Sequence, residues 1–182
     1  MTKQDWIDSS LKLVSKHGAD ALKIDVLCKK LKVTKGSFYH HFKSHKIFIA
    51  EILEYWYKTF TLDIINQIKE HQDNPIKQIE LLDEIIYSKD LNIEIEFRAW
   101  GLRNKSVLPY MEKIDKERIL VIKNIQEKIN PNSDEKTNEN MATYIYCQFI
   151  GSLFIQPKLS REKQKELDNF FLNLILQKDT KC

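Results

Sequence analysis

Residues 33–44, "VTKGSFYHHFKS", gather hydroxyl, ammonium and imidazole groups around two phenylalanines. Phe38 and Phe42 are four residues apart, so a helix would place both rings on one face, where they can pack into a core. Gly36 and His40 would then point away from that face. A short helix with a buried aromatic stripe and an outer face of small residues and hydrogen-bond donors could contact a polyanion.

The charge distribution favours the same kind of partner. Residues 1–48 contain ten lysines, four aspartates and no glutamate, a balance of +6, whereas the whole chain carries only +3. A basic module on a mildly acidic body predicts that the module alone binds nucleic acid. A lysine-rich surface that is merely solvated is the alternative if this charge is considered by itself.

The composition excludes several other classes of protein. The chain has 182 residues, 42% of them hydrophobic and 30% charged, as in an ordinary soluble globular protein. No apolar run is long enough to span a bilayer and the N-terminus lacks a signal-peptide pattern, so we expect a cytoplasmic protein with no membrane partner. The three cysteines are far apart, which favours free thiols over a disulfide framework.

The periodicity is helical almost throughout, and an all-α fold of about nine helices is expected. Three short helices are predicted at about 3–17, 24–31 and 35–41, with Gly18 ending the first and Thr34 capping the third. A long helix at about 44–71 should connect this module to the rest of the chain. Five further helices are predicted at about 76–88, 91–104, 107–129, 134–155 and 161–178, with Ser106 and Ser160 as N-caps. We therefore expect a small three-helix module at 1–45 and a larger helical part at 46–182.

The short helices have the geometry of a helix-turn-helix, whose second helix enters the major groove of DNA. Lys35 can reach a guanine edge or a phosphate, and Ser37 can form hydrogen bonds with several kinds of base. Gly36 lets the backbone approach closely, and Tyr39 and the neighbouring histidines suit phosphate oxygens.

The same residues resemble the signature of TetR-family transcriptional regulators. The match covers roughly residues 4–54, in which an amphipathic helix closes on Gly18 and "IDVLCKKLKV" precedes "VTKGSFYHHFKS". The resemblance implies a set of DNA-contacting positions, namely Thr34, Lys35, Gly36, Ser37, Tyr39, His40 and His41.

Three positions depart from the family pattern. His45 stands where the family usually has a phosphate-contacting lysine, so we add His45 and the adjacent Lys46 to the expected DNA contacts. Lys32 replaces a usual glycine and should adopt an uncommon backbone conformation. Lys23 replaces a usual hydroxyl N-cap.

The resemblance also implies that a helix-turn-helix DNA-binding domain at 1–45 is followed by a helical effector-binding and dimerisation domain at 46–182. Some of the aromatic residues of this second domain, the body, would then line a small-molecule pocket. Glu94, Glu96 or Arg98 could supply a polar group there, and simple core packing is the alternative for the aromatic residues. The candidates for the pocket are Trp56, Phe60, Tyr87, Phe97, Trp100, Tyr110 and Tyr144.

The last two helices are expected to form a homodimer interface, because Gly151 and Ser152 allow close helix approach and aromatic residues surround them. An intramolecular core is the alternative. The candidates for the interface are Ile145, Phe149, Ser152, Phe170 and Leu174.

Together these features predict a dimeric, sequence-specific regulator that binds double-stranded operator DNA, a repressor released by a small-molecule effector. The alternative is an effector-independent regulator or activator. A helical enzyme or metal-binding protein is a remote alternative: His41 and His45 have ligand spacing, but no carboxylate or cysteine is near in sequence. We therefore expect no catalytic residue, no metal and no cofactor.

Overall fold

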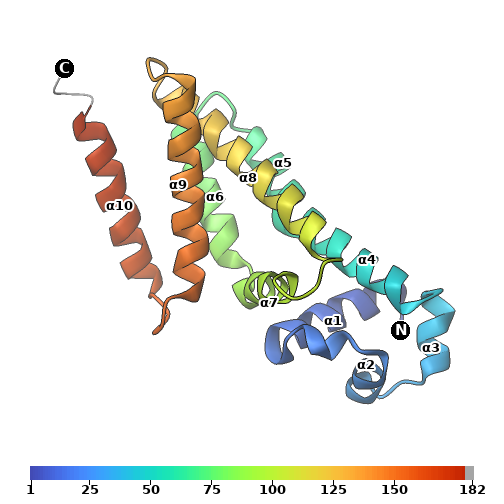
Figure 1. Ribbon diagram of the computed structural model, residues 1–182. Coiled ribbons are helices and arrows are strands. Elements are labelled where there is room, and N and C mark those ends of the chain that lie inside the picture. The colour runs from blue at the N-terminus through green and yellow to red at the C-terminus, as the bar shows by residue number, and fades with distance from the viewer. Residues whose placement is uncertain (179–182) are drawn as a thin grey trace. The chain divides into compact units, whose positions relative to one another are not determined.

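The computed structural model of the protein describes residues 1–178, and the side chains of Leu172 and of residues 174–178 lie outside this description. The described residues form helices and no strand, which confirms the all-α prediction. Figure 1 shows α1, α2 and α3 gathered at one end of the long helix that contains α4 and α5.

The head of the molecule consists of three helices, which have the predicted bounds: α1 is Lys3–His17, α2 is Ile24–Leu31 and α3 is Lys35–His41. A short 3-10 turn, η1 (Ala19–Leu22), links the first two. Thr2 and Asp5 form a reciprocal capping box at the start of α1. Gly18 ends α1 at φ 75°, a conformation that favours glycine.

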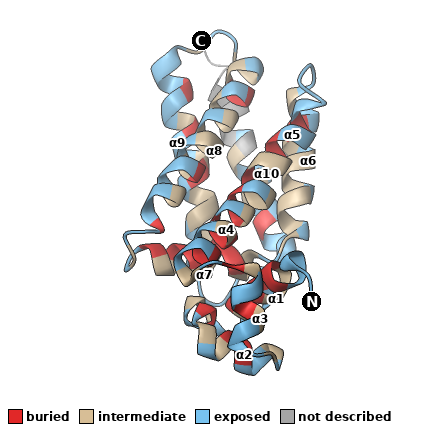
Figure 2. Cartoon of the chain, turned by 90° about the vertical axis from the view of Figure 1, so that its right-hand side faces the viewer, coloured by how far each residue is buried: buried red, intermediate tan, exposed pale blue. Residues whose placement is uncertain are grey.

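An aromatic cluster holds the head together. The ring centroid of Phe38 lies 5.6 Å from Trp6, 5.3 Å from Phe42 and 5.2 Å from Phe48. All four side chains are fully buried. Several pairs meet edge to face, which aromatic rings prefer. The buried positions are drawn red in Figure 2. α3 is therefore fixed by its rings, and its opposite face is left to solvent.

The predicted long helix is present but contains a wider turn. α4 (His45–Tyr57) runs into η2 (Lys58–Leu62), a π-helical segment, which continues as α5 (Asp63–Lys69). Ser44 caps the helix by accepting a hydrogen bond from the Ile47 amide at 3.2 Å. Since the three pieces are continuous, the head is joined directly to the body.

The body helices follow the prolines and caps of the sequence. They are α6 (Pro75–Ser88), α7 (Leu91–Gly101), α8 (Leu108–Ile129), α9 (Glu135–Phe154) and α10 (Arg161–Lys178). With the long helix counted once, the described residues form the expected nine helices.

One of the two predicted serine caps is wrong. Ser160 accepts from the Lys163 amide at 3.2 Å, as predicted. At α8 the N-cap is Val107 instead of Ser106. The amide and hydroxyl of Ser106 instead bond the Asn104 side-chain oxygen, at 3.0 and 2.8 Å, so they are used in the preceding turn.

The chain divides into two compact units, residues 1–146 and 147–182. The head therefore lies in the same unit as most of the body, and the predicted functional boundary after residue 45 stays a prediction. Within the described part of the chain, no helix is long and apolar enough to cross a membrane.

Candidate nucleic-acid interface

The turn between α2 and α3 sets the direction of the candidate recognition helix. Lys32 adopts the left-handed conformation, with φ 56° and ψ 43°, as expected from its place in the pattern. The Val33 amide donates to the Cys28 carbonyl at 3.0 Å and closes the turn. Lys23 caps α2 without a side-chain hydrogen bond. Both departures from the usual pattern are thus accommodated by the backbone alone.

The Thr34 side chain starts α3, because its Oγ1 accepts a hydrogen bond from the Ser37 amide at 3.2 Å. The buried Phe38 and Phe42 hold the inner side of the segment against the core. Most of the predicted DNA contacts are exposed, namely Thr34, Lys35, Gly36, Tyr39, His40 and Lys46. The remaining three, Ser37, His41 and His45, are half-buried.

Lys35 is held by a residue that the sequence pattern did not single out. Its Nζ lies 2.5 Å from Oδ1 of Asp25 on α2, and both side chains are more than half exposed. The hydrogen bond to Asp25 and its negative charge raise the pKa of Lys35. Lys35 therefore stays charged at the start of α3 with its ammonium group directed by α2.

Among the described residues, none requires a glycine at position 36. The described atom nearest to a Cβ built there is the Thr34 Oγ1, at 3.6 Å, an ordinary van der Waals distance. The backbone of Gly36 is helical and its face of α3 is exposed. A requirement for glycine here would come from a partner molecule that approaches the backbone closely.

His45 has a structural contact in addition to its expected role. Its Nε2 lies 2.8 Å from the Leu22 carbonyl oxygen, so Nε2 carries the proton and donates to η1. The ring also lies near Phe48, with centroids 6.1 Å apart. His45 thus ties the start of the long helix to the turn before α2, and the adjacent Lys46 is exposed.

The predicted pocket residues only partly gather in one place. The rings of Trp56 and Phe97 lie 4.9 Å apart and are fully buried, and Trp100 follows at 6.2 Å from Phe97. The others differ in exposure: Phe60, Tyr87 and Tyr110 are half-buried, and Tyr144 is 58% exposed. The assignment of these residues to a pocket stays a prediction.

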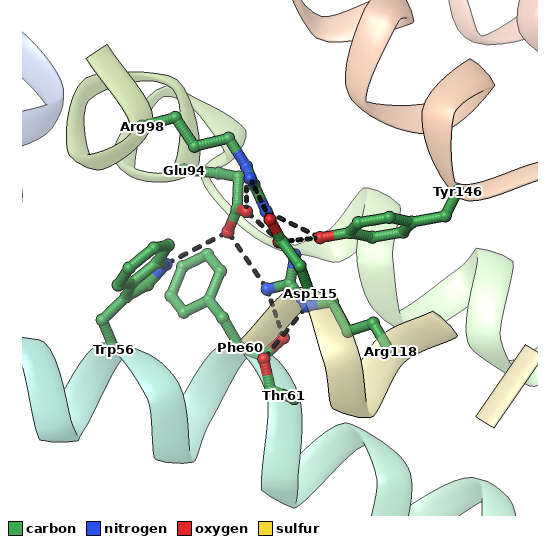
Figure 3. Close-up of polar contacts among 8 residues, drawn as sticks. All are labelled: Trp56, Phe60, Thr61, Glu94, Arg98, Asp115, Arg118 and Tyr146. Carbon is green, nitrogen blue, oxygen red and sulfur yellow. Dashed lines mark hydrogen bonds and ion pairs between the residues drawn. The ribbon is translucent and has the colours of Figure 1, made fainter. Parts of the chain in front are cut away.

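Beside this aromatic group lies a buried network of charges, drawn in Figure 3. Glu94 on α7 accepts from Arg98 Nε at 2.8 Å and from the Trp56 indole at 3.1 Å. Arg118 on α8 donates to both Glu94 oxygens, at 2.8 and 3.1 Å. Arg98 also donates to Asp115 and to the Tyr146 hydroxyl, each at 2.7 Å. The network connects the long helix with α7, α8 and α9.

The two arginines keep Glu94 ionised although it is buried. Burial alone would raise its pKa, but the charges and hydrogen bonds of Arg118 and Arg98 outweigh that effect and lower the pKa. Glu94 and Arg98 are among the polar groups predicted from the sequence, whereas Arg118 and Asp115 are not. Among the described residues, no cluster of three or more histidine, cysteine or acidic side chains could hold a metal ion.

The predicted dimer residues lie on both sides of the division between the two units. Ile145, in the first unit, is half-buried. In the second unit Phe149 and Ser152 are half-buried and Phe170 is 61% exposed. The side chain of Leu174 lies outside the described residues.

In a comparison with known proteins, the head of the chain matches a protein family. Residues 7–52 match the family model for bacterial regulatory proteins of the tetR family. The matched range contains most of α1, all of α2 and α3, and the first part of α4. The head of the chain is therefore similar to the corresponding part of tetR-family regulatory proteins.

Two further comparisons extend the likeness of the chain beyond its head. Over 110 residues it is 32% identical to the uncharacterized HTH-type transcriptional regulator YuxN of Bacillus subtilis (strain 168). That alignment covers 60% of the chain and 36% of the relative's length, so the chain spans about a third of that relative. A crystal structure of a transcriptional regulator (TerR/AcrR family) from Aquifex aeolicus VF5 shares the fold, with a TM-score of 0.68 and 24% identity. It matches over 96% of this chain and 99% of its own.

Proposed function

We propose that this protein is a DNA-binding transcriptional regulator of the TetR type that acts as a homodimer on double-stranded operator DNA. The observation that carries the proposal is the exposed face of α3, which presents Lys35, Gly36 and Tyr39 while buried rings fix its other side. This arrangement suits a helix that enters the major groove. The match of the head to the tetR family of bacterial regulatory proteins favours this function over an enzymatic one.

The dimer is part of the proposal because one recognition helix buries too little surface for useful specificity. Two heads related by a two-fold axis can read half-sites one helical turn or more apart. Phe154 and Phe170, which are 49% and 61% exposed in the second unit, are suited to an interface between two copies.

We further propose repression that is relieved by a small-molecule effector bound in the body. α7 supports this coupling, because it takes part in both the buried network and the contact with the head. Ser15 of α1 donates to Asp90, the N-cap of α7, at 2.5 Å. An effector that moves α7 would therefore shift the equilibrium between head orientations. A ligand screen that finds stabilising compounds, none of which changes operator affinity, would favour the effector-independent alternative.

Removing the Lys35 ammonium is expected to weaken operator binding. Lys35→Ala should cost about 1–3 kcal/mol if the side chain reads a guanine, and the preference at one base pair should relax. Footprinting of wild type and variant on DNA flanking the gene measures both effects. Equal protection by the two proteins at every salt concentration would contradict this role.

Asp25→Asn tests the contact between Asp25 and Lys35 by removing the negative charge that directs the lysine. The amide keeps the shape of the aspartate but not its charge, so Lys35 is freed to pair with any nearby phosphate. We expect binding to random-sequence duplex to strengthen more than binding to the operator, so the ratio of the two affinities falls. A rise in that ratio would show that Asp25 does not help Lys35 to discriminate between sequences.

The absence of a side chain at position 36 gives a second test of the interface. Gly36→Ala should leave the head as stable as wild type or up to about 1 kcal/mol more stable, since alanine favours a helix and has room. Operator affinity should nevertheless fall at least tenfold, because the added methyl group stands between α3 and the groove. Thermal unfolding and fluorescence anisotropy measure the two quantities. Unchanged affinity would place the DNA on another face of the head.

A further inference from the structure

The π-helical segment η2 lies where the long helix passes from the head to the body. Its wider turn is visible in the hydrogen bond from the Asp63 amide to the Lys58 carbonyl, five residues earlier. Such turns are rare, occur mostly as single turns inside α-helices and are frequent at functional sites. Since an α-helix turns by about 100° per residue, the state of this turn sets the rotation of α4 relative to α5.

One side chain from another helix holds the segment. Arg118 of α8 donates from Nη2 to the Phe60 carbonyl oxygen and from Nε to the Thr61 Oγ1, each at 3.0 Å. Both acceptors lie inside η2, and the Thr61 side chain is buried. A backbone carbonyl that accepts from a guanidinium group forms a strong, charge-assisted hydrogen bond. Arg118 therefore stabilises the segment in its π-helical form.

Arg118 is in turn held by α7. Glu94 receives two of its hydrogen bonds, in a bidentate arrangement, and binds Arg98 and Trp56 with the same two oxygens. In Figure 3 Glu94 lies between the two arginines, and Arg118 reaches from it to Phe60 and Thr61. A displacement of α7 would thus change the position of Arg118 and, through it, the support of η2.

We propose that Arg118 is a positioning residue that locks the π-helical segment and thereby fixes the orientation of the DNA-binding head on the body. Glu94 keeps Arg118 engaged, so the Glu94–Arg118 contact is where a change in α7 reaches the long helix. The proposal rests on the proposed function for its effect on DNA binding, but its effect on the long helix can be measured without DNA.

The most direct test removes one acceptor of Arg118 with little change in shape. Thr61→Val in the full-length protein replaces the hydroxyl by a methyl group, whereas Thr61→Ser retains the hydroxyl. Tyr146→Phe is the matched control, because it removes a buried hydroxyl of the same network that bonds Arg98 and Asp115. Amide hydrogen exchange over residues 58–66 and operator affinity are measured for all four proteins.

In Thr61→Val, amide exchange over residues 58–66 should be at least tenfold faster than in wild type. Exchange in Thr61→Ser and in Tyr146→Phe should stay within threefold of wild type. Operator affinity of Thr61→Val should fall about tenfold, because the binding-competent orientation of the heads is less populated. Affinity for random-sequence duplex should not change, since each head keeps its own contacts.

If amide exchange over residues 58–66 is as slow in Thr61→Val as in wild type, Arg118 does not lock the segment. The same conclusion follows if Thr61→Val and Tyr146→Phe accelerate exchange equally. If exchange is faster in Thr61→Val but operator affinity is unchanged, the segment does not fix the orientation of the head. Should the wild-type protein itself select no DNA, the proposed function fails, and the exchange data still decide whether Arg118 locks the segment.

Discussion

Replacing Glu94 with glutamine is expected to lower the free energy of unfolding by about 3–5 kcal/mol. The carboxylate is buried and receives hydrogen bonds from Arg98, Arg118 and the Trp56 indole. A glutamine side chain has one acceptor oxygen and no charge, and its amide group would face the donors of the arginines. Two guanidinium groups would then be buried with only Asp115 to balance them, and an unpaired buried charge is costly.

Urea denaturation of both proteins at neutral pH measures this difference, and Glu80→Gln is the control. Glu80 forms an exposed pair with Lys77 at 3.3 Å, so its replacement should cost less than about 1 kcal/mol. A loss in Glu94→Gln as small as in Glu80→Gln would show that the buried network does not stabilise the fold.

The same pair of proteins should differ less in acid. The pKa of Glu94 is lowered in the folded state, so its carboxylate stabilises the fold above the ordinary glutamate pKa of 4.5. That contribution disappears as the pH falls through the folded pKa. The stability difference between wild type and Glu94→Gln should therefore shrink below about pH 4.5, and a difference that grows in acid would contradict the assignment.

Replacing Phe38 with alanine is expected to cost about 3–5 kcal/mol of stability, concentrated in the head. The ring is fully buried and lies within 5.6 Å, centroid to centroid, of Trp6, Phe42 and Phe48. Its removal leaves a cavity among rings that α1, α3 and α4 hold in place. Since α3 is attached to the core mainly by this ring and Phe42, DNA binding should be lost as well.

Phe38→Leu is the control, because it preserves most of the volume and should cost less than about 1.5 kcal/mol. Hydrogen exchange identifies where the stability is lost. Exchange should accelerate in α1 to α3 of Phe38→Ala and remain slow in α8. Equal acceleration in the head and in α8 would show that the two parts unfold as one cooperative unit.

The helices could be predicted from the sequence because their signals are local. Thr34 as an N-cap, Gly18 as a stop and the prolines each act within one turn of the residue that carries them, and the observed bounds follow them closely. The exception at Ser106 has a local cause too, since Asn104 competes for its hydrogen bonds. The widened turn at Lys58–Leu62 has no comparable signal, because its support comes from a different helix.

The site was only partly predictable for the same reason. The outer face of α3 follows from helical periodicity once Phe38 and Phe42 are assigned to the core. The contact of His45 with Leu22 and the contact of Arg118 with Glu94 join residues 23 and 24 positions apart. No pattern of spacing indicates such pairs, since they depend on how the helices pack.

Selection from a library of random double-stranded DNA with the purified full-length protein tests the central claim most directly. The proposed function predicts enrichment of one inverted repeat whose half-sites are related by two-fold symmetry. Affinity for it should fall steeply with salt, with a slope of about −0.9 for each phosphate contacted. Lys35→Ala and Gly36→Ala should bind the enriched sequence more weakly than wild type. If no sequence is enriched over several rounds at low salt, or if the two variants bind as well as wild type, α3 is not a recognition helix.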